Sequence, residues 1–298
     1  MHTHPRVLVG VDGTEGSIEA LRWAAHEAAR RGWPLCVMTC AELPVAEEAG
    51  MVGVGVGGGG FAGSTMDAIV HDHEAVNQRA VHLARSFGLD LDVTGETVLG
   101  SAGYAVVSAA HPDDIIVIGA TSHPGRLTDL LGSVATIVAQ RAHGPVVVVH
   151  GTDRRHLTPQ RIVVGIDGSD CSHDALLWAV EEAMRCDAEL VLVHAWAYPY
   201  THHRSGSEDP RDEMRLDAMR TLEAASLEAR AMCAPVRVHS IISEENPAKA
   251  LIDAGNDADL VVVGSRGRGG FAALMLGSVS RSVVQHASVP VVVVRRPD

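Results

Sequence analysis

Short runs of β-branched residues alternate with longer amphipathic segments along the whole chain. The runs RVLVGVD (6–12) and RIVVGID (161–167) are apolar nearly throughout, as expected for strands buried on both faces of a parallel sheet. Segments with apolar residues at helical spacing follow over 17–31 and 172–186, and each begins with a serine that can cap a helix. The pattern predicts an α/β protein.

The rest of each half continues this alternation. Strand-like runs are LCVMTC, DLDVTGETV, DIIVIGA and PVVVV in the first half, and LVLVHAW, VRVHSII, DLVVVGS and PVVVV in the second. Helical patterns separate them, including long ones near 65–87 and 211–231. We therefore expect two tandem, doubly wound, Rossmann-like domains, each with a five-stranded parallel sheet that binds ligands beyond the carboxyl ends of its strands.

The two halves are copies of one sequence. Residues 6–35 align with 161–190, sharing a Val-Gly-x-Asp-Gly motif and a tryptophan in the following helix, and the parts from DIIVIGA and DLVVVGS onward align as well. The first copy carries extra residues around the glycine run 53–60. The repeat predicts a first domain over 1–150, a polar linker over 151–160 and a second domain over 161–298.

The segment GSRGRGGFAALMLGS (264–278) leaves a predicted strand and reaches a helix at its second Gly-Ser. Glycines bring backbone N–H groups close to a bound anion, and the helix start adds further N–H groups, so this crossover suits a phosphate. A glycine hinge before a helix cap is the alternative interpretation. GVGVGGGG (53–60) matches G-x-G-x-x-G without the strand before it or the helix after it, and we interpret it as a flexible insertion.

Composition narrows the function classes. The net charge of −13 disfavours nucleic acid and anionic membranes as partners. The only lysine, Lys249, lies in NPAKAL away from any glycine loop, which excludes the Walker-type phosphate loop. Five cysteines without a CxxC pair predict neither a disulfide framework nor a zinc site. With no signal-peptide pattern and no bilayer-spanning apolar run, we expect a cytoplasmic protein.

Gly264, Gly267 and Gly277-Ser278 form the pattern G-x2-G-x9-G-S, and an aspartate follows the first strand in VGVDGT and VGIDGS. Together these motifs resemble the ATP-binding branch of the universal stress protein family, in its tandem, mycobacterial-type form. The resemblance covers both halves. It implies ATP at the strand ends, with Asp12 or Asp167 near the ribose and adenine and the glycine loops around the phosphates; Mg²⁺ is left open. A turn or helix-capping role is the alternative for Asp167.

The nucleotide-binding residues that the resemblance implies lie in both domains. In the first domain they are Gly10, Asp12, Gly119, Thr121, Ser122, Gly125, Gly132, Ser133 and Val134. In the second they are Gly165, Asp167, His194, Gly264, Arg266, Gly267, Arg268, Gly269, Gly270, Gly277, Ser278, Val279 and Ser280. No catalytic residue and no metal ligand is assigned.

The first copy departs from the motif. Ser122 replaces its second glycine and Pro124 stiffens the turn, so we expect the first site to bind ATP more weakly than the second. In the family, outer strands such as PVVVV pair across a two-fold axis; here the two runs can pair with each other and close an internal pseudo-dimer, and a homodimer of chains is left open.

The function expected is that of an ATP-binding regulatory or stress-adaptation protein, in which nucleotide occupancy biases conformation or the choice of an unidentified protein partner. A slow ATPase or another nucleotide-hydrolysing enzyme is the alternative. Hydrolysis would be slow because no activated base is evident in the sequence. A third hypothesis is an interaction module that holds its nucleotide as a structural element.

Overall fold

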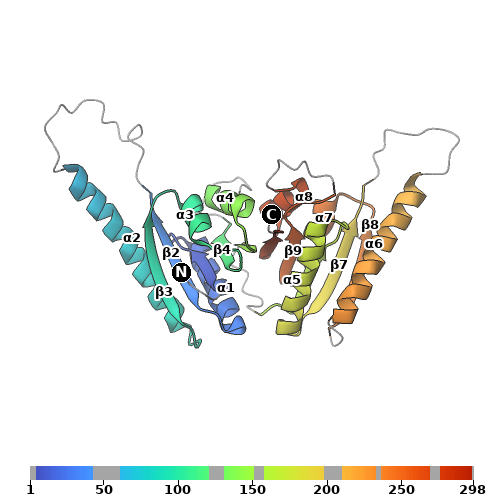
Figure 1. Ribbon diagram of the computed structural model, residues 1–298, viewed down its shortest axis with the longest axis horizontal. Helices are drawn as coiled ribbons and strands as arrows, with labels where there is room; N and C mark the ends of the chain where they lie inside the picture. Colours follow the sequence, from blue (N-terminus) through green and yellow to red (C-terminus); the bar gives the residue numbers. More distant parts are fainter. Residues whose placement is uncertain are drawn as a thin grey trace, which may run out of the picture.

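The computed structural model describes residues 5–42, 61–120, 131–150, 158–197, 210–232, 236–268 and 276–296, with no description of the side chains at 61–66 and 210. Within these ranges the chain is an α/β protein built on one mostly parallel sheet, as the alternating pattern predicts (Figure 1). The first half contains β1 (Val7–Gly10), α1 (Glu15–Arg31), β2 (Leu35–Ala41), α2 (Phe61–Ser86), β3 (Val93–Leu99), α3 (Ala102–Ala109), β4 (Ile115–Gly119), α4 (Ser133–Arg141) and β5 (Val146–Val149). The second half contains β6 (Arg161–Gly165), α5 (Asp170–Cys186), β7 (Glu189–Ala195), α6 (Pro210–Met232), β8 (Val238–Ser243), α7 (Pro247–Gly255), β9 (Leu260–Gly264), α8 (Ser278–His286) and β10 (Val291–Val294).

The two five-stranded halves join into a single ten-stranded sheet, with the order β3-β2-β1-β4-β5-β10-β9-β6-β7-β8. Strands run parallel within each half, and β5 pairs with β10 antiparallel, with Val147 opposite Val292. The two valine runs thus pair with each other, as expected from the sequence. We call this pairing the seam. The strand order reverses between β1 and β4 and between β6 and β9, where open parallel sheets bind their ligands.

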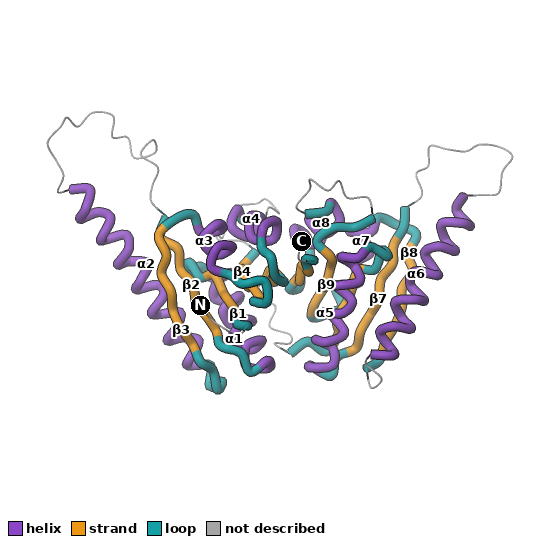
Figure 2. Tube along the Cα trace, viewed as in Figure 1, coloured by secondary structure: helices purple, strands orange, loops and turns teal. Residues whose placement is uncertain are grey.

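Helices cover both faces of the sheet (Figure 2). The pairs α1/α2 and α5/α6 contribute to one apolar cluster, and α3/α4 and α7/α8 to the other. Alternate seam residues serve the two clusters, Val147 and Val292 one and Val148 and Val291 the other. Because such strands have no solvent side, the runs are apolar throughout.

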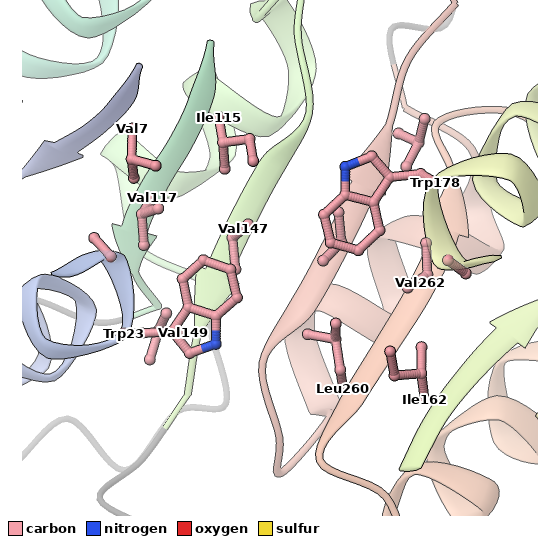
Figure 3. Close-up of a cluster of buried hydrophobic side chains, with 14 of the residues drawn as sticks. Val7, Trp23, Ile115, Val117, Val147, Val149, Ile162, Trp178, Leu260 and Val262 are labelled. Atoms are coloured by element: carbon pink, nitrogen blue, oxygen red, sulfur yellow. The ribbon is translucent and has the colours of Figure 1, made fainter. Parts of the chain in front are cut away.

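On the first face α1 and α5 approach each other across the seam, where Trp23 lies beside Val147 and Val149 of β5 and Trp178 lies across the seam from it (Figure 3). Beside them Glu27 and Glu182 are completely buried. Arg31 donates hydrogen bonds to both carboxylates, at 2.6 Å to Glu182 Oε2, so a charged cluster joins the two halves.

On the opposite face each half reaches a helix of the other just after its last strand. His150 Nε2 donates to the Val284 carbonyl in α8 at 2.6 Å, and Arg295 Nη1 donates to the Ala142 carbonyl at the end of α4 at 3.0 Å. The two donors occupy corresponding positions in the repeat, and their bonds tie α4 and α8 to the partner half.

Candidate functional site

The site in the second half begins at the turn between β6 and α5. Asp167 Oδ1 accepts hydrogen bonds from the Ser169 backbone N–H (2.9 Å) and hydroxyl (2.6 Å), and Gly168 takes the positive φ of 78° that the turn requires. Ser169 then caps α5 by accepting from the Ser172 N–H. Asp167 therefore has the turn role that was its alternative interpretation.

The other oxygen of Asp167 holds the glycine loop that follows β9. The Arg268 backbone N–H donates to Asp167 Oδ2 at 3.0 Å. A Cβ on Gly267 would come within 2.4 Å of that same oxygen, so only glycine allows this approach. Burial raises the pKa of Asp167, but the hydrogen bonds from Ser169, Ser172 and Arg268 outweigh it, and the pKa lies below the usual value.

Two glycines of the loop motif have different physical causes. A Cβ on Gly264 would come within 2.6 Å of the Cys171 backbone, so packing of β9 against α5 requires glycine there. At Gly277 the nearest atoms to a Cβ lie at 3.5 Å and φ is −66°, which any residue tolerates. Gly277 is thus not required by the packing of the described protein atoms, and the space above it suits a ligand.

Gly277 is also the N-cap of α8, and no side chain caps this helix. Ser278, Val279 and Ser280 form its first turn, whose N–H groups lie at the positive end of the helix dipole. The Ser280 hydroxyl is engaged elsewhere, since it donates to the Gly264 carbonyl at 2.6 Å and fixes the end of β9 against α8.

His194 lies next to the end of β7 and is only 6% exposed. Its Nδ1 has no hydrogen-bond partner among the described residues. Burial lowers the pKa of His194, while nearby Asp167 opposes that shift. The ring is therefore neutral at pH 7 and offers an unpaired nitrogen beside the carboxylate.

A charged pair completes the second-half site. Arg268 Nη1 donates to Asp217 Oδ2 on α6 at 2.9 Å, and this bond lowers the pKa of Asp217. Both side chains are more than half exposed. Sequence reasoning missed Asp217, which is one of several acidic residues on a polar helix. It also missed Ser169, and its expectation that Ser17 and Ser172 cap the helices is wrong: the N-caps are Thr14 and Ser169, three residues earlier.

The first half repeats the turn but not its surroundings. Asp12 Oδ1 accepts from the Thr14 N–H at 2.9 Å and from the Thr14 hydroxyl at 2.6 Å. At the position of His194 stands Thr39, which is buried and accepts a hydrogen bond from Asn77 of α2 at 3.2 Å. At this position the second half offers an unpaired imidazole nitrogen, whereas in the first half the Thr39 hydroxyl already has a hydrogen-bond partner within the protein.

The remaining predicted residues of the first half lie where the strand ends gather. Gly119 packs like Gly264, since a Cβ would come within 2.7 Å of the Gly16 carbonyl oxygen. Gly132 is the N-cap of α4, again without a side-chain cap, and Ser133 and Val134 follow it.

Gly10 and Gly165 end β1 and β6, where a Cβ would touch Ile118 at 3.3 Å and Leu251 at 3.1 Å. Arg266 lies between Ser265 and Gly267, just after β9. Some predicted residues and segments lie outside the described part of the chain: Thr121, Ser122, Gly125, Gly269, Gly270, the glycine run 53–60 and linker residues 151–157.

The described residues were also compared with the requirements of a metal site and of a membrane-spanning helix. They contain no group of three or more His, Cys, Asp or Glu side chains arranged to hold a metal ion. In the same residues, no helix combines the length and apolar character needed to cross a membrane.

Comparison with known proteins gives one consistent result. The model of the universal stress protein family matches residues 4–150 and again 158–295. A universal stress protein of Mycolicibacterium smegmatis is 34% identical over 298 residues, covering 97% of this chain and 96% of the relative. One of Mycobacterium tuberculosis H37Rv is 33% identical over 296 residues, covering 97% of each chain. The crystal structure of a universal stress protein from Archaeoglobus fulgidus DSM 4304 has the same fold, with a TM-score of 0.67, 21% identity and coverage of 98% and 97%.

Proposed function

This chain belongs to the universal stress protein family, with two family domains in tandem, and from that membership we propose that it binds ATP at the strand ends and acts as a regulatory protein. Nucleotide occupancy would bias its conformation or its choice of protein partner. We assign residues 1–150 and 161–298 to the two domains and 151–160 to the linker.

The observation that carries the proposal is the combination at the start of α8. At Gly277 the described residues would leave room for a Cβ, and in the described part of the chain no side-chain hydrogen bond caps the first N–H groups of α8. Backbone amides at a helix start, next to a glycine loop, hold phosphate oxygens without a lysine. We assign the phosphates to Arg266, Gly267, Arg268, Gly277, Ser278 and Val279, with Gly269 and Gly270 on sequence grounds.

The nucleoside belongs on the other side of the loop. Asp167 is a carboxylate beside the reversal point of the strand order, and ribose hydroxyls are donors that suit it. The unpaired Nδ1 of His194 would gain a partner from the adenine. Gly165 and Gly264 form the floor, and Ser280 positions β9.

The first domain would hold a second, weaker nucleotide through Gly10, Asp12, Gly119, Gly132, Ser133 and Val134, with Thr121, Ser122 and Gly125 in its loop. Its lower affinity rests on Ser122 in place of glycine and on Thr39 in place of histidine. Any Mg²⁺ would be held by the phosphates rather than by a protein cluster.

Slow hydrolysis of ATP is the alternative function. The described site contains no lysine, and His194 is neutral but buried. We propose binding without significant turnover, in a cytoplasmic protein whose described cysteines are free thiols. The seam suggests that the two domains act as an internal pseudo-dimer, and further association of whole chains is left to measurement.

Titration calorimetry with ATP tests the proposal. Wild-type protein should show a strong and a weak site, Asp167→Ala should remove the strong one, and Asp12→Ala should remove the weak one. Absence of heat in the wild type, or a stronger first site, would refute the assignment. Phosphate release well above about 1 s⁻¹ would instead favour the enzyme. Mass spectrometry of ligand released from purified protein identifies the physiological nucleotide.

A further inference from the structure

The Arg268 side chain bridges the glycine loop and α6 above the turn that contains Asp167. Its backbone N–H is bound to Asp167 Oδ2 at 3.0 Å and its guanidinium to Asp217 Oδ2 at 2.9 Å. Between these ends, Arg268 Nη2 lies 3.3 Å from where a Cβ on Gly168 would stand. The side chain therefore extends across the place where a ribose would approach the carboxylate.

Both oxygens of Asp167 accept hydrogen bonds from within the protein. Oδ1 accepts from Ser169, and Oδ2 accepts from the Arg268 backbone N–H. Oδ1 already accepts two hydrogen bonds, so a sugar hydroxyl would bind the remaining lone pair of Oδ2, beside the Arg268 amide. The contact between Arg268 and Asp217 holds the guanidinium across the approach to that oxygen.

The ion pair between Asp217 and Arg268 is weak enough for Arg268 to exchange Asp217 for another anion. Asp217 and Arg268 are 59% and 54% exposed, and solvent-exposed ion pairs are weak. A guanidinium forms stronger, bidentate bonds with a phosphate group than with a single carboxylate oxygen. A polyphosphate at the start of α8 would compete with Asp217 for the same cation.

We propose that Arg268 selects polyphosphate nucleotides over nucleosides and that Asp217 tunes their affinity: Asp217 holds Arg268 across the approach to Asp167, and a ligand with phosphates draws Arg268 away from it. This inference rests on the proposed nucleotide site and adds the residues that set its specificity. A nucleoside must break the pair with nothing to receive the arginine, whereas ATP provides the acceptor.

The pair of Asp217 and Arg268 is not repeated at the corresponding sequence positions of the first domain. Arg85 and Arg230 donate to the corresponding carbonyls of Val93 and Val238, which aligns α2 with α6 and makes Asp72 the counterpart of Asp217. The residue at the sequence position corresponding to Arg268 is His123.

The test measures dissociation constants of ATP, adenosine and inorganic tripolyphosphate in full-length protein carrying Asp12→Ala, so that the second site is observed. Asp217→Asn should tighten ATP and tripolyphosphate about threefold, because a competitor is removed, and Arg268→Gln should weaken both about tenfold. The double variant should equal Arg268→Gln alone. Asp212→Asn, an exposed acidic residue on the same helix, is the matched control and should change nothing.

The outcomes separate this inference from the proposed function. ATP binding that is unaffected by Asp217→Asn, or equal effects of Asp212→Asn and Asp217→Asn, overturns the inference and leaves the function standing. Tripolyphosphate binding that depends on Asp217, without binding of ATP, would show that phosphate competes with Asp217 but would refute both the nucleotide and its selection. Binding of none of the three ligands refutes both. Hydrogen exchange of the ligand-free protein gives an independent readout, since Asp217→Asn should speed exchange of the Arg268 amide.

Discussion

The turn after β1 and the turn after β6 contain the same hydrogen bonds at the same lengths, 2.9 and 2.6 Å, yet they face different surroundings. Asp167 continues through its second oxygen to the glycine loop, and an unpaired histidine stands beside it. Asp12 is exposed, and the histidine's position is taken by Thr39, which is bound to Asn77. The shared aspartate therefore builds the turn in both halves, and the residues around it decide what each half can bind.

The same asymmetry recurs where the halves meet. Glu27 and Glu182 are counterparts. Arg30 and Arg31, which each contact both carboxylates, come from α1, and α5 has Cys186 at the position of Arg31. Burial and the neighbouring Glu27 raise the pKa of Glu182, against the pull of Arg31 and Arg30. The duplicated helices have become complementary rather than identical.

The largest effect is expected when Arg31 of α1 is replaced by cysteine, the residue that α5 has at the corresponding position, Cys186. Arg31→Cys leaves two fully buried glutamates short of a cation and should lower the free energy of unfolding by about 3 kcal/mol in urea titrations. Arg185→Cys is the matched control, because Arg185 is 31% exposed and touches only the edge of the cluster; its cost should stay below about 1 kcal/mol. Equal costs would show that the cluster does not hold the halves together.

The second largest effect is expected when Gly267 of the second loop is replaced by serine, the residue that the first loop has at the corresponding position, Ser122. In Gly267→Ser the new Cβ would collide with Asp167 Oδ2, so the loop must leave the carboxylate. We expect ATP affinity at the second site to fall about tenfold, equivalent to about 1.4 kcal/mol, in calorimetry on an Asp12→Ala background. An unchanged affinity would mean that Ser122 does not explain a weaker first site.

Gly277→Ala should give a smaller effect, confined to binding. The protein has room for the methyl group, so the free energy of unfolding should change by at most about 1 kcal/mol, the usual range for an N-cap position. ATP affinity should fall about fivefold, because the methyl group fills space assigned to phosphate. Gly132→Ala in the first half is the control and should leave the second site unaffected. Loss of stability without loss of binding would contradict the assignment.

The smallest effect concerns pH. Burial lowers the pKa of His194 from its ordinary value of 6.5, so the native protein takes up a proton there less readily than the unfolded chain. Stability is therefore lost as the pH falls below 6.5. Burial lowers the pKa of His26 and His150 in the same way, so all three contribute. The charged groups that face His194 are Asp167, Arg268 and Asp217. In His194→Gln, urea titrations between pH 7 and 5 should show a shallower decline, and an unchanged slope would contradict a neutral, buried imidazole.

Much of the fold could be predicted from local pattern, because buried parallel strands and amphipathic helices each leave a periodic signature. The pairing of the two valine runs was expected, because runs this apolar are a hazard as free edges, but its antiparallel direction was not predicted. The turn at Asp167 could also be predicted from the sequence, because Asp-Gly-Ser contains both the acceptor and the donor of its hydrogen bond. These features are encoded within a few residues of one another.

What could not be predicted depends on partners distant in the sequence. Glu27 and Glu182 look like surface residues of polar helix faces, and only the meeting of the two halves buries them. No sequence motif distinguishes Asp217 from the other acidic residues of α6, and its contact with Arg268 forms only because the fold places α6 beside the glycine loop. Gly264 and Gly277 belong to one motif, yet a Cβ would clash at Gly264 and would fit at Gly277, a difference that only the surrounding structure reveals.

The seam has a consequence for how the protein behaves on dilution. Because β5 and β10 belong to one chain, their pairing is an intramolecular event whose effective concentration is set by the connecting residues rather than by the amount of protein. The ten-stranded sheet should therefore remain whole at nanomolar abundance, where two separate five-stranded subunits would drift apart. A cell holding only a few copies would still have both domains joined across one sheet.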